Sequence, residues 1–181
     1  MNKFKRIIAA GLLLAMGVFA FAGCNKADRS GGKSTKQERG PLDITKVTYL
    51  IHSGDQPHVE LYIISSDLKG THYSINDDGA KKYDYLEGEL PPEDQYEVTE
   101  FEVSDSEWNN IKLLATRANF MELPEELPPL EGDDMGSTYI KFETKKDVNK
   151  SGGYGAGSGS ENEHVRFARV EKAIRDVVRN K

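Results

Sequence analysis

Polar and apolar residues alternate along several short segments of the chain, and a period of two predicts β-strands. In residues 44–53, for example, Val47, Tyr49 and Ile51 fall on one side and Thr48 falls on the other. Gly, Asp, Asn and Pro separate the first three of these segments, which predicts tight turns and therefore antiparallel neighbours. The predicted strands are 44–53, 59–65, 71–75, 95–103 and 138–144.

A repeat near 3.6 residues replaces this alternation after Ser104 and predicts an amphipathic helix. Ser104 and Glu107 have the spacing of a capping box, in which each side chain bonds a backbone N–H at the helix start. Trp108, the only tryptophan, falls on the apolar side, so we interpret it as a core residue and not as a ligand platform. Asn119 is expected to end the helix in the left-handed conformation, with Phe120 folded back on the last turn.

A second helix is predicted from another capping-box pattern, Ser160 to Glu163, to about Arg179. The segment before it, 145–160, is rich in glycine and is expected to be a loop. Its run Gly152–Gly159 leads into the helix N-terminus, a place that favours anions. The run lacks both the G-x-G-x-x-G spacing and the lysine of a phosphate-binding loop, so a flexible loop is favoured over a nucleotide site.

The predicted order of elements is four strands, a helix, a strand and a helix. Two amphipathic helices need an apolar surface to cover. We therefore expect an α+β fold, an antiparallel sheet of about five strands with both helices packed on one face. The segments 80–94 and 122–134 are acidic and contain prolines, and we expect surface loops there. Residues 44–181 have a size typical of one domain.

The first 24 residues have the layout of an export signal, because three basic residues among the first six precede an uncharged apolar run over 7–22. This run is shorter than the ~20 apolar residues that span a bilayer, which disfavours a permanent transmembrane helix. It ends in Phe21, Ala22, Gly23 and Cys24, a bulky apolar residue followed by two small residues and a cysteine. This sequence resembles the lipobox of bacterial lipoproteins.

The resemblance implies that residues 1–23 are a lipoprotein signal peptide and that a diacylglyceryl group is attached to the thiol of Cys24. Cys24 is the only cysteine, so no disulfide within the chain explains it; an ordinary signal peptide beside a chance cysteine is the alternative. Two acyl chains give stable anchoring, at about 0.8 kcal/mol per buried CH₂ group. Residues 24–43 are then the lipidated cysteine and a flexible tether. Residues 44–181 are a single extracytoplasmic domain, held on the outer face of the cell membrane.

Charge is distributed unevenly along the chain. Residues 41–181 carry 28 acidic and 16 basic residues, a net charge of −12 before histidine. An acidic domain repels phosphates, so nucleic acid is not expected as a partner. The expected partners are the membrane, through the diacylglyceryl-cysteine, and an envelope protein. A solvated acidic surface that keeps the domain soluble is the simplest interpretation of the charge.

Three histidines accompany the first three strands, and a hairpin would bring His52 and His58 near each other, with His72 on the next strand. Imidazoles on one sheet can bind zinc or copper. No acid or thiol is spaced with them in the sequence, and exposed histidine on strands is ordinary. We therefore predict no metal site.

Two acidic segments are candidates for calcium binding. Ser74–Gly79 has part of an EF-hand pattern, but Ser74 and Tyr85 stand at the first and twelfth positions, where carboxylates are needed. The cluster of Glu131, Asp133 and Asp134 could hold calcium loosely. A solvated loop is the favoured interpretation of both segments.

The sequence shows no frame for a catalytic site. There is no cysteine besides Cys24, no G-x-S-x-G, and no serine or aspartate placed with a histidine as in a triad. We therefore expect no catalytic residues, no enzyme activity and no cofactor. The predicted function is a membrane-anchored bacterial lipoprotein with a small extracytoplasmic binding or interaction domain. The alternatives are a cation- or small-ligand-binding envelope protein and a hydrolase with dispersed carboxylates.

Overall fold

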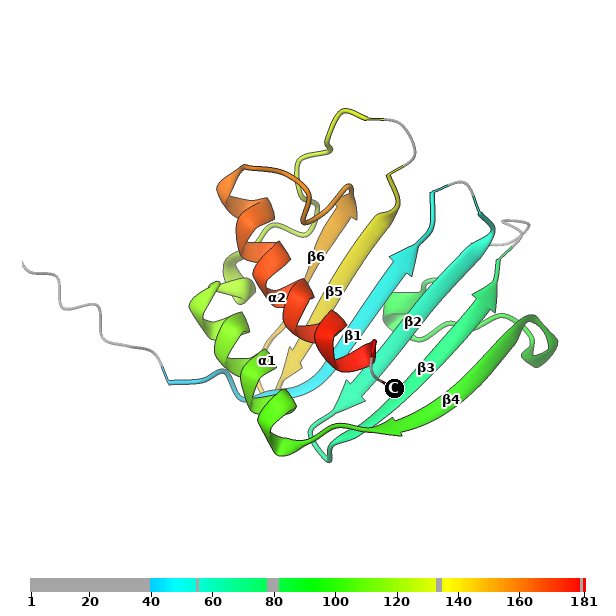
Figure 1. The fold of residues 1–181 in the computed structure, drawn as a ribbon, viewed down its shortest axis with the longest axis horizontal. Helices are drawn as coiled ribbons and strands as arrows, with labels where there is room; N and C mark the ends of the chain where they lie inside the picture. Colours follow the sequence, from blue (N-terminus) through cyan, green and yellow to red (C-terminus); the bar gives the residue numbers. More distant parts are fainter. Residues whose placement is uncertain (1–39, 55, 78–81, 133–134, 180) are drawn as a thin grey trace, which may run out of the picture. The chain divides into compact units, whose positions relative to one another are not determined.

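The structure is a computed structural model that describes residues 40–54, 56–77, 82–132, 135–179 and 181 (Figure 1). Cys24, the predicted signal peptide and most of the predicted tether lie outside the described residues. The strands are β1 Ile44–His52, β2 His58–Ser65, β3 Lys69–Asn76, β4 Tyr96–Glu102, β5 Ser137–Thr144 and β6 Val148–Tyr154. The helices are α1 Asp105–Arg117 and α2 Asn162–Val178, with 3₁₀ turns η1 Tyr85–Glu87, η2 Glu93–Gln95 and η3 Phe120–Glu122.

All strands join one antiparallel sheet in the order β4-β3-β2-β1-β5-β6. The first four strands are consecutive neighbours, so short turns connect β1, β2 and β3 as the sequence predicts. The α+β class and the antiparallel sheet are confirmed. The predicted number of about five strands is wrong, because the described residues form six.

The additional strand is β6, which lies in the glycine-rich segment that was predicted to be a loop. A Cβ atom on Gly152 would lie 2.2 Å from the carbonyl oxygen of Thr138, so only glycine allows β6 to approach β5 this closely. On its other side, Gly152 accepts a hydrogen bond from the N–H of Leu127 and donates one to the carbonyl of Glu125. Long-range pairing on both sides therefore overrides the low strand propensity of glycine.

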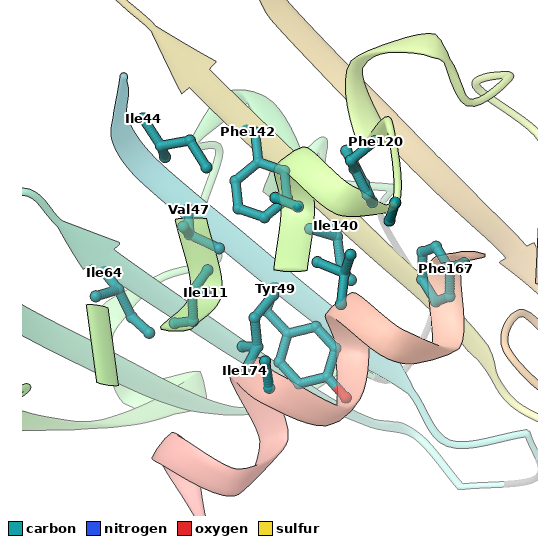
Figure 2. Packing of buried hydrophobic residues seen from close by; sticks show 14 of the residues in the cluster. Ile44, Val47, Tyr49, Ile64, Ile111, Phe120, Ile140, Phe142, Phe167 and Ile174 are labelled. Atoms are coloured by element: carbon teal, nitrogen blue, oxygen red, sulfur yellow. The ribbon is translucent and has the colours of Figure 1, made fainter. Parts of the chain in front are cut away.

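Both helices pack on one face of the sheet, where they bury the larger of two hydrophobic clusters. Figure 2 shows side chains of this cluster from both layers, Val47 and Ile140 from the strands and Ile111 and Ile174 from the helices. Trp108 of α1 is 5% exposed and belongs to this cluster, so its predicted core role is confirmed. The spacing of apolar residues near 3.6 therefore places the two helices as the sequence predicts.

The opposite face of the sheet is not a bare solvent surface. Leu61 and Ile75 are fully buried there, under Tyr85 of η1 and the partly buried Leu86 and Leu90. The predicted surface loop 80–94 is exposed over most of its described part, but its buried Tyr85 also covers a second, smaller core. Its apolar residues are few and irregularly spaced, so no period marked them as buried.

The two predicted helix starts have different outcomes. At α1 both bonds of the capping box between Ser104 and Glu107 are present, and Asn119 ends the helix region in the left-handed conformation with φ 47°. At α2 the predicted box is wrong, because Glu161 is the N-cap residue and makes no side-chain cap. The first turn of α2 is instead fixed by the buried His164, whose Nε2 lies 2.9 Å from the carbonyl oxygen of Pro128.

Candidate functional site

A groove of about 750 Å³ lies between α2 and the sheet, and we call it the α2 groove. It is lined by Glu171, Arg175, Val178 and Arg179 of α2 and its C-cap, by Tyr49, Ile51, Tyr62 and Thr138 of the sheet, and by residues 52–54, 135–136 and 155–158. In Figure 1, α2 crosses in front of β5 and β1, whereas the upper parts of β2, β3 and β4 are left uncovered. The volume is within the range of small-molecule sites, about 300–1,000 Å³.

The floor of the groove is aromatic. Tyr49 of β1 and Tyr62 of β2 are opposite each other in the strand register, with ring centroids 6.0 Å apart. Tyr62 in turn stacks on His72 of β3, with centroids 4.3 Å apart and planes 5° from parallel. Cross-strand pairing thus forms a row of three rings that begins under α2 and continues onto the uncovered part of the sheet.

The wall of the groove is a buried hydrogen-bond network. The hydroxyl of Tyr49 donates to Oε1 of Glu171 at 3.1 Å, and the guanidinium of Arg175 donates to the same oxygen. Burial, with the nearby charge of Glu171, raises the pKa of Tyr49 well above its ordinary value. Burial alone would lower the pKa of Arg175, but the Glu171 carboxylate outweighs it and keeps this pKa raised. The carboxylate of Glu171, which is 7% exposed, therefore has two donors on one buried oxygen.

Two arginine groups of this wall have unused hydrogen-bond capacity. The Nε of Arg175 is buried and has no hydrogen-bond partner among the described residues. Arg179 is exposed, lines the groove and forms no ion pair with a described residue. Guanidinium groups bind carboxylate and phosphate through paired, charge-assisted hydrogen bonds. This end of the groove can therefore bind an anionic group.

The glycine-rich turn 155–158 lines the groove next to Glu171. Gly155 and Gly157 have φ of 67° and 82°, a conformation that glycine adopts without strain. A Cβ atom on Gly157 would lie 2.7 Å from Oε2 of Glu171. This turn belongs to the glycine run 152–159 that leads into the N-terminus of α2. It therefore also packs against the middle of that helix, at Glu171.

The structure separates the three histidines that the sequence analysis grouped. Nε2 of His58 lies 2.6 Å from Oε1 of Glu60, and Nε2 of His72 contacts the other oxygen of the same carboxylate. Each imidazole nitrogen thus faces a different oxygen of Glu60. His52 instead lies beside Tyr85, with ring centroids 5.9 Å apart, and its burial lowers the pKa of its imidazole although Asp77 opposes the shift.

Glu60 is the functional candidate that sequence reasoning missed. The signal was its spacing from His58, since residues two apart on a strand share a face. Both imidazoles point at Glu60 and not at a shared open position. In the part of the chain that the structure describes, no group of three His, Cys, Asp or Glu side chains is arranged to hold a metal ion.

Each calcium candidate lies partly outside the described residues. Asp78 and Gly79 of the partial EF-hand pattern lie outside them, and so do Asp133 and Asp134 of the acidic cluster. Glu131 is exposed. The two segments therefore add no described side-chain arrangement to the candidate site.

No protein-family model matches this chain, and no curated protein matches it. Among the described helices, neither α1 nor α2 combines the length and the apolar character needed to cross a bilayer. The geometry of the α2 groove and the sequence around Cys24 are therefore the features that bear on function.

Proposed function

We propose that this protein is a bacterial lipoprotein, held on the outer face of the membrane by a diacylglyceryl group on Cys24. Its domain binds a small polar ligand in the α2 groove. An anionic group of the ligand lies against Arg175 and Arg179, and the body of the ligand lies on the partly exposed ring of Tyr62. The lipobox-like sequence supports the anchor, and the shape and chemistry of the groove support the binding role.

The observation that carries the proposal is the free hydrogen-bond capacity of Arg175 and Arg179. A buried N–H without a partner costs about 1–3 kcal/mol, and a ligand acceptor would remove that cost. The two guanidinium groups line one groove in a domain whose net charge is −12 over residues 41–181. Their position offers anions a local attraction that the rest of the acidic surface does not.

The number of carboxylates at the groove favours a binding function over a hydrolytic one. Glycoside hydrolysis requires two carboxyl groups, about 5–10 Å apart, on either side of the scissile bond. Among the described residues that line the groove, Glu171 is the only carboxylate, and it is engaged by Tyr49 and Arg175. A small ligand is also favoured over a cation, because no described cluster has the ligands of a metal site.

The ligand-binding part is tested by thermal unfolding of the full chain carrying Cys24→Ser, with inorganic phosphate and citrate as anionic probes and glucose as a neutral one. A ligand that binds only the folded state raises the melting temperature. We expect citrate to raise it, Arg179→Gln to remove most of that rise, and Arg169→Gln to leave it unchanged. Arg169 is the matched control, because it is exposed on α2 and does not line the groove. Equal loss in both variants, or no rise with either anion, would contradict the proposal.

The anchoring part is tested separately. The wild-type protein and the Cys24→Ser variant are expressed in a bacterial host and fractionated, and the purified wild-type protein is analysed by mass spectrometry. We expect the wild-type protein in the membrane fraction with the mass of a lipidated N-terminal cysteine. The variant should leave that fraction. The proposed lipid anchor is rejected if the variant stays with the membrane and the wild-type protein has an unmodified mass. This outcome would leave the proposed ligand binding in the α2 groove untouched.

A further inference from the structure

The two edges of the sheet differ in what covers them. At one edge, β6 forms a bridge to Glu126, and the backbone of Gly152 is bonded to that segment on its outer side. At the other edge, β4 pairs with β3 alone, and residues 97–100 are exposed. Figure 1 shows β4 as the outermost strand of the sheet on that side. In the described part of the chain, β4 is therefore the open edge.

The backbone groups that β4 presents outward follow from its register. Val103 donates to the carbonyl of Leu68 on the β3 side at 2.8 Å. Along an antiparallel strand, the backbone N–H and C=O groups of successive residues point alternately toward one neighbouring strand and toward the other side. The register between β3 and β4 has no shift, so this alternation is unbroken along β4. The N–H and C=O groups of Val98, Glu100 and Glu102 consequently point away from the sheet. Three successive outward positions are enough to pair with a short strand.

The side chains of β4 give this edge a chemical preference. Its sequence contains Glu97, Glu100 and Glu102 and no lysine or arginine. Val98 is 55% exposed, one of the few large apolar side chains at the described surface with that exposure. Opposite charges directly across a strand pair stabilise it, and like charges destabilise it. A strand that pairs here is favoured if it is basic and has an apolar residue near Val98.

We propose that β4 is a docking edge, and that it binds an extended basic segment of another protein as an additional antiparallel strand. The backbone of Val98, Glu100 and Glu102 provides the hydrogen bonds, and the glutamates select lysine or arginine on the incoming strand. This inference does not depend on the α2 groove, which lies on the helix-covered face.

A second copy of this chain fits the edge poorly. Pairing two β4 strands would bring six glutamates, three from each copy, onto one two-stranded ribbon without a basic residue on either strand. Charged residues on an edge strand are a known means of preventing such self-association. The charge pattern therefore excludes a symmetric partner and admits a basic one.

The test uses a proline substitution that blocks the edge without breaking the sheet. Val98→Pro removes an outward N–H, which β3 does not use, and proline is tolerated on edge strands at such positions. Val98→Thr is the matched control that keeps the N–H. Circular dichroism and the melting temperature establish that both variants are folded. Glu100→Gln tests the charge separately.

The probe is a synthetic peptide with alternating lysine and valine, compared with one in which glutamate replaces lysine. Binding to the full chain carrying Cys24→Ser is measured by fluorescence anisotropy, and amide exchange reports protection of the outward N–H groups of residues 98, 100 and 102. We expect only the basic peptide to bind. Val98→Pro should reduce its affinity about tenfold or more, which corresponds to about 1.4 kcal/mol. Glu100→Gln should reduce the affinity less, and Val98→Thr should leave it unchanged. The proposal is overturned if Val98→Pro binds as well as the control, since binding is then a charge effect without strand pairing. It is also overturned if the amides are protected before peptide is added.

Discussion

The hydroxyl of Tyr49 donates a hydrogen bond to Glu171 at 3.1 Å, which joins the central strand β1 to a helix 122 residues later in the chain. Figure 2 shows the Tyr49 ring on the helix-covered face, with its oxygen directed toward α2. Arg175, one turn further along α2, donates to the same carboxylate. This network fixes α2 over the sheet and forms the wall of the α2 groove, so Arg175 belongs both to the packing of α2 and to the proposed binding site.

Substitutions in this network are expected to have unequal costs. Tyr49→Phe removes one hydrogen bond but leaves Glu171 paired with Arg175, so we expect a loss of about 1 kcal/mol in the free energy of unfolding. Glu171→Leu leaves both Tyr49 and Arg175 without their acceptor, and we expect about 2–3 kcal/mol. Urea unfolding measures both values. Equal losses in the two variants would contradict this account, because the geometry gives Glu171 two donors and Tyr49 one acceptor.

Lys141 is a buried cation on the opposite face of the sheet. Its Nζ donates to the carbonyl of Leu86 and to Oε2 of Glu87, both at 2.9 Å, and this contact lowers the pKa of Glu87. We expect Glu87→Gln to destabilise the fold by about 1 kcal/mol, because it leaves a buried ammonium without its counter-charge. Lys141→Met should cost less, or even stabilise, because it removes the buried charge itself. The two variants are compared by urea unfolding, and a larger loss in Lys141→Met would contradict this account.

His52 is expected to make stability depend on pH. Burial lowers the pKa of its imidazole in the folded state, so the unfolded chain binds the proton more readily. The neutral His52 imidazole therefore favours the folded state fully above its unfolded pKa of about 6.5. This stabilisation is lost as the pH falls through that pKa toward the lower pKa of the folded state. The melting temperature of His52→Asn should therefore fall less than that of the wild type between about pH 7.5 and about pH 5.5. An identical fall in the two proteins would show that His52 titrates alike in the folded and unfolded chains.

The elements that sequence reasoning placed correctly have strong local signals. Val47 and Tyr49 alternate with polar residues along β1, and Ser104 with Glu107 caps α1. In each case neighbouring residues alone determine the structure, through side-chain alternation or through a local hydrogen bond. Asn119 belongs to the same group, because its left-handed conformation follows from its own side chain and the end of the helix.

The site could be predicted only in part, because its residues meet through long-range pairing. The histidines and the glycine turn were visible in the sequence, but nothing in it placed Tyr49, Glu171 and Arg175 together. Glu60 was likewise overlooked, although it is two residues from His58 on β2. These contacts depend on the register of the strands and on the position of α2 across the sheet, and neither property has a local signal.

Gly152 offers the sharpest test of the part of the fold that the sequence did not predict. A Cβ atom there would lie 2.2 Å from the carbonyl oxygen of Thr138 and 2.6 Å from Cα of Tyr139, both backbone atoms that cannot move without separating β5 from β6. We expect Gly152→Ala to reduce the free energy of unfolding by about 1–3 kcal/mol, measured in urea. Gly40→Ala is the control, because no atom lies within 4 Å of its Cβ position. If both variants were as stable as the wild type, the glycine-rich segment would be a loop after all, and the sheet would end at β5.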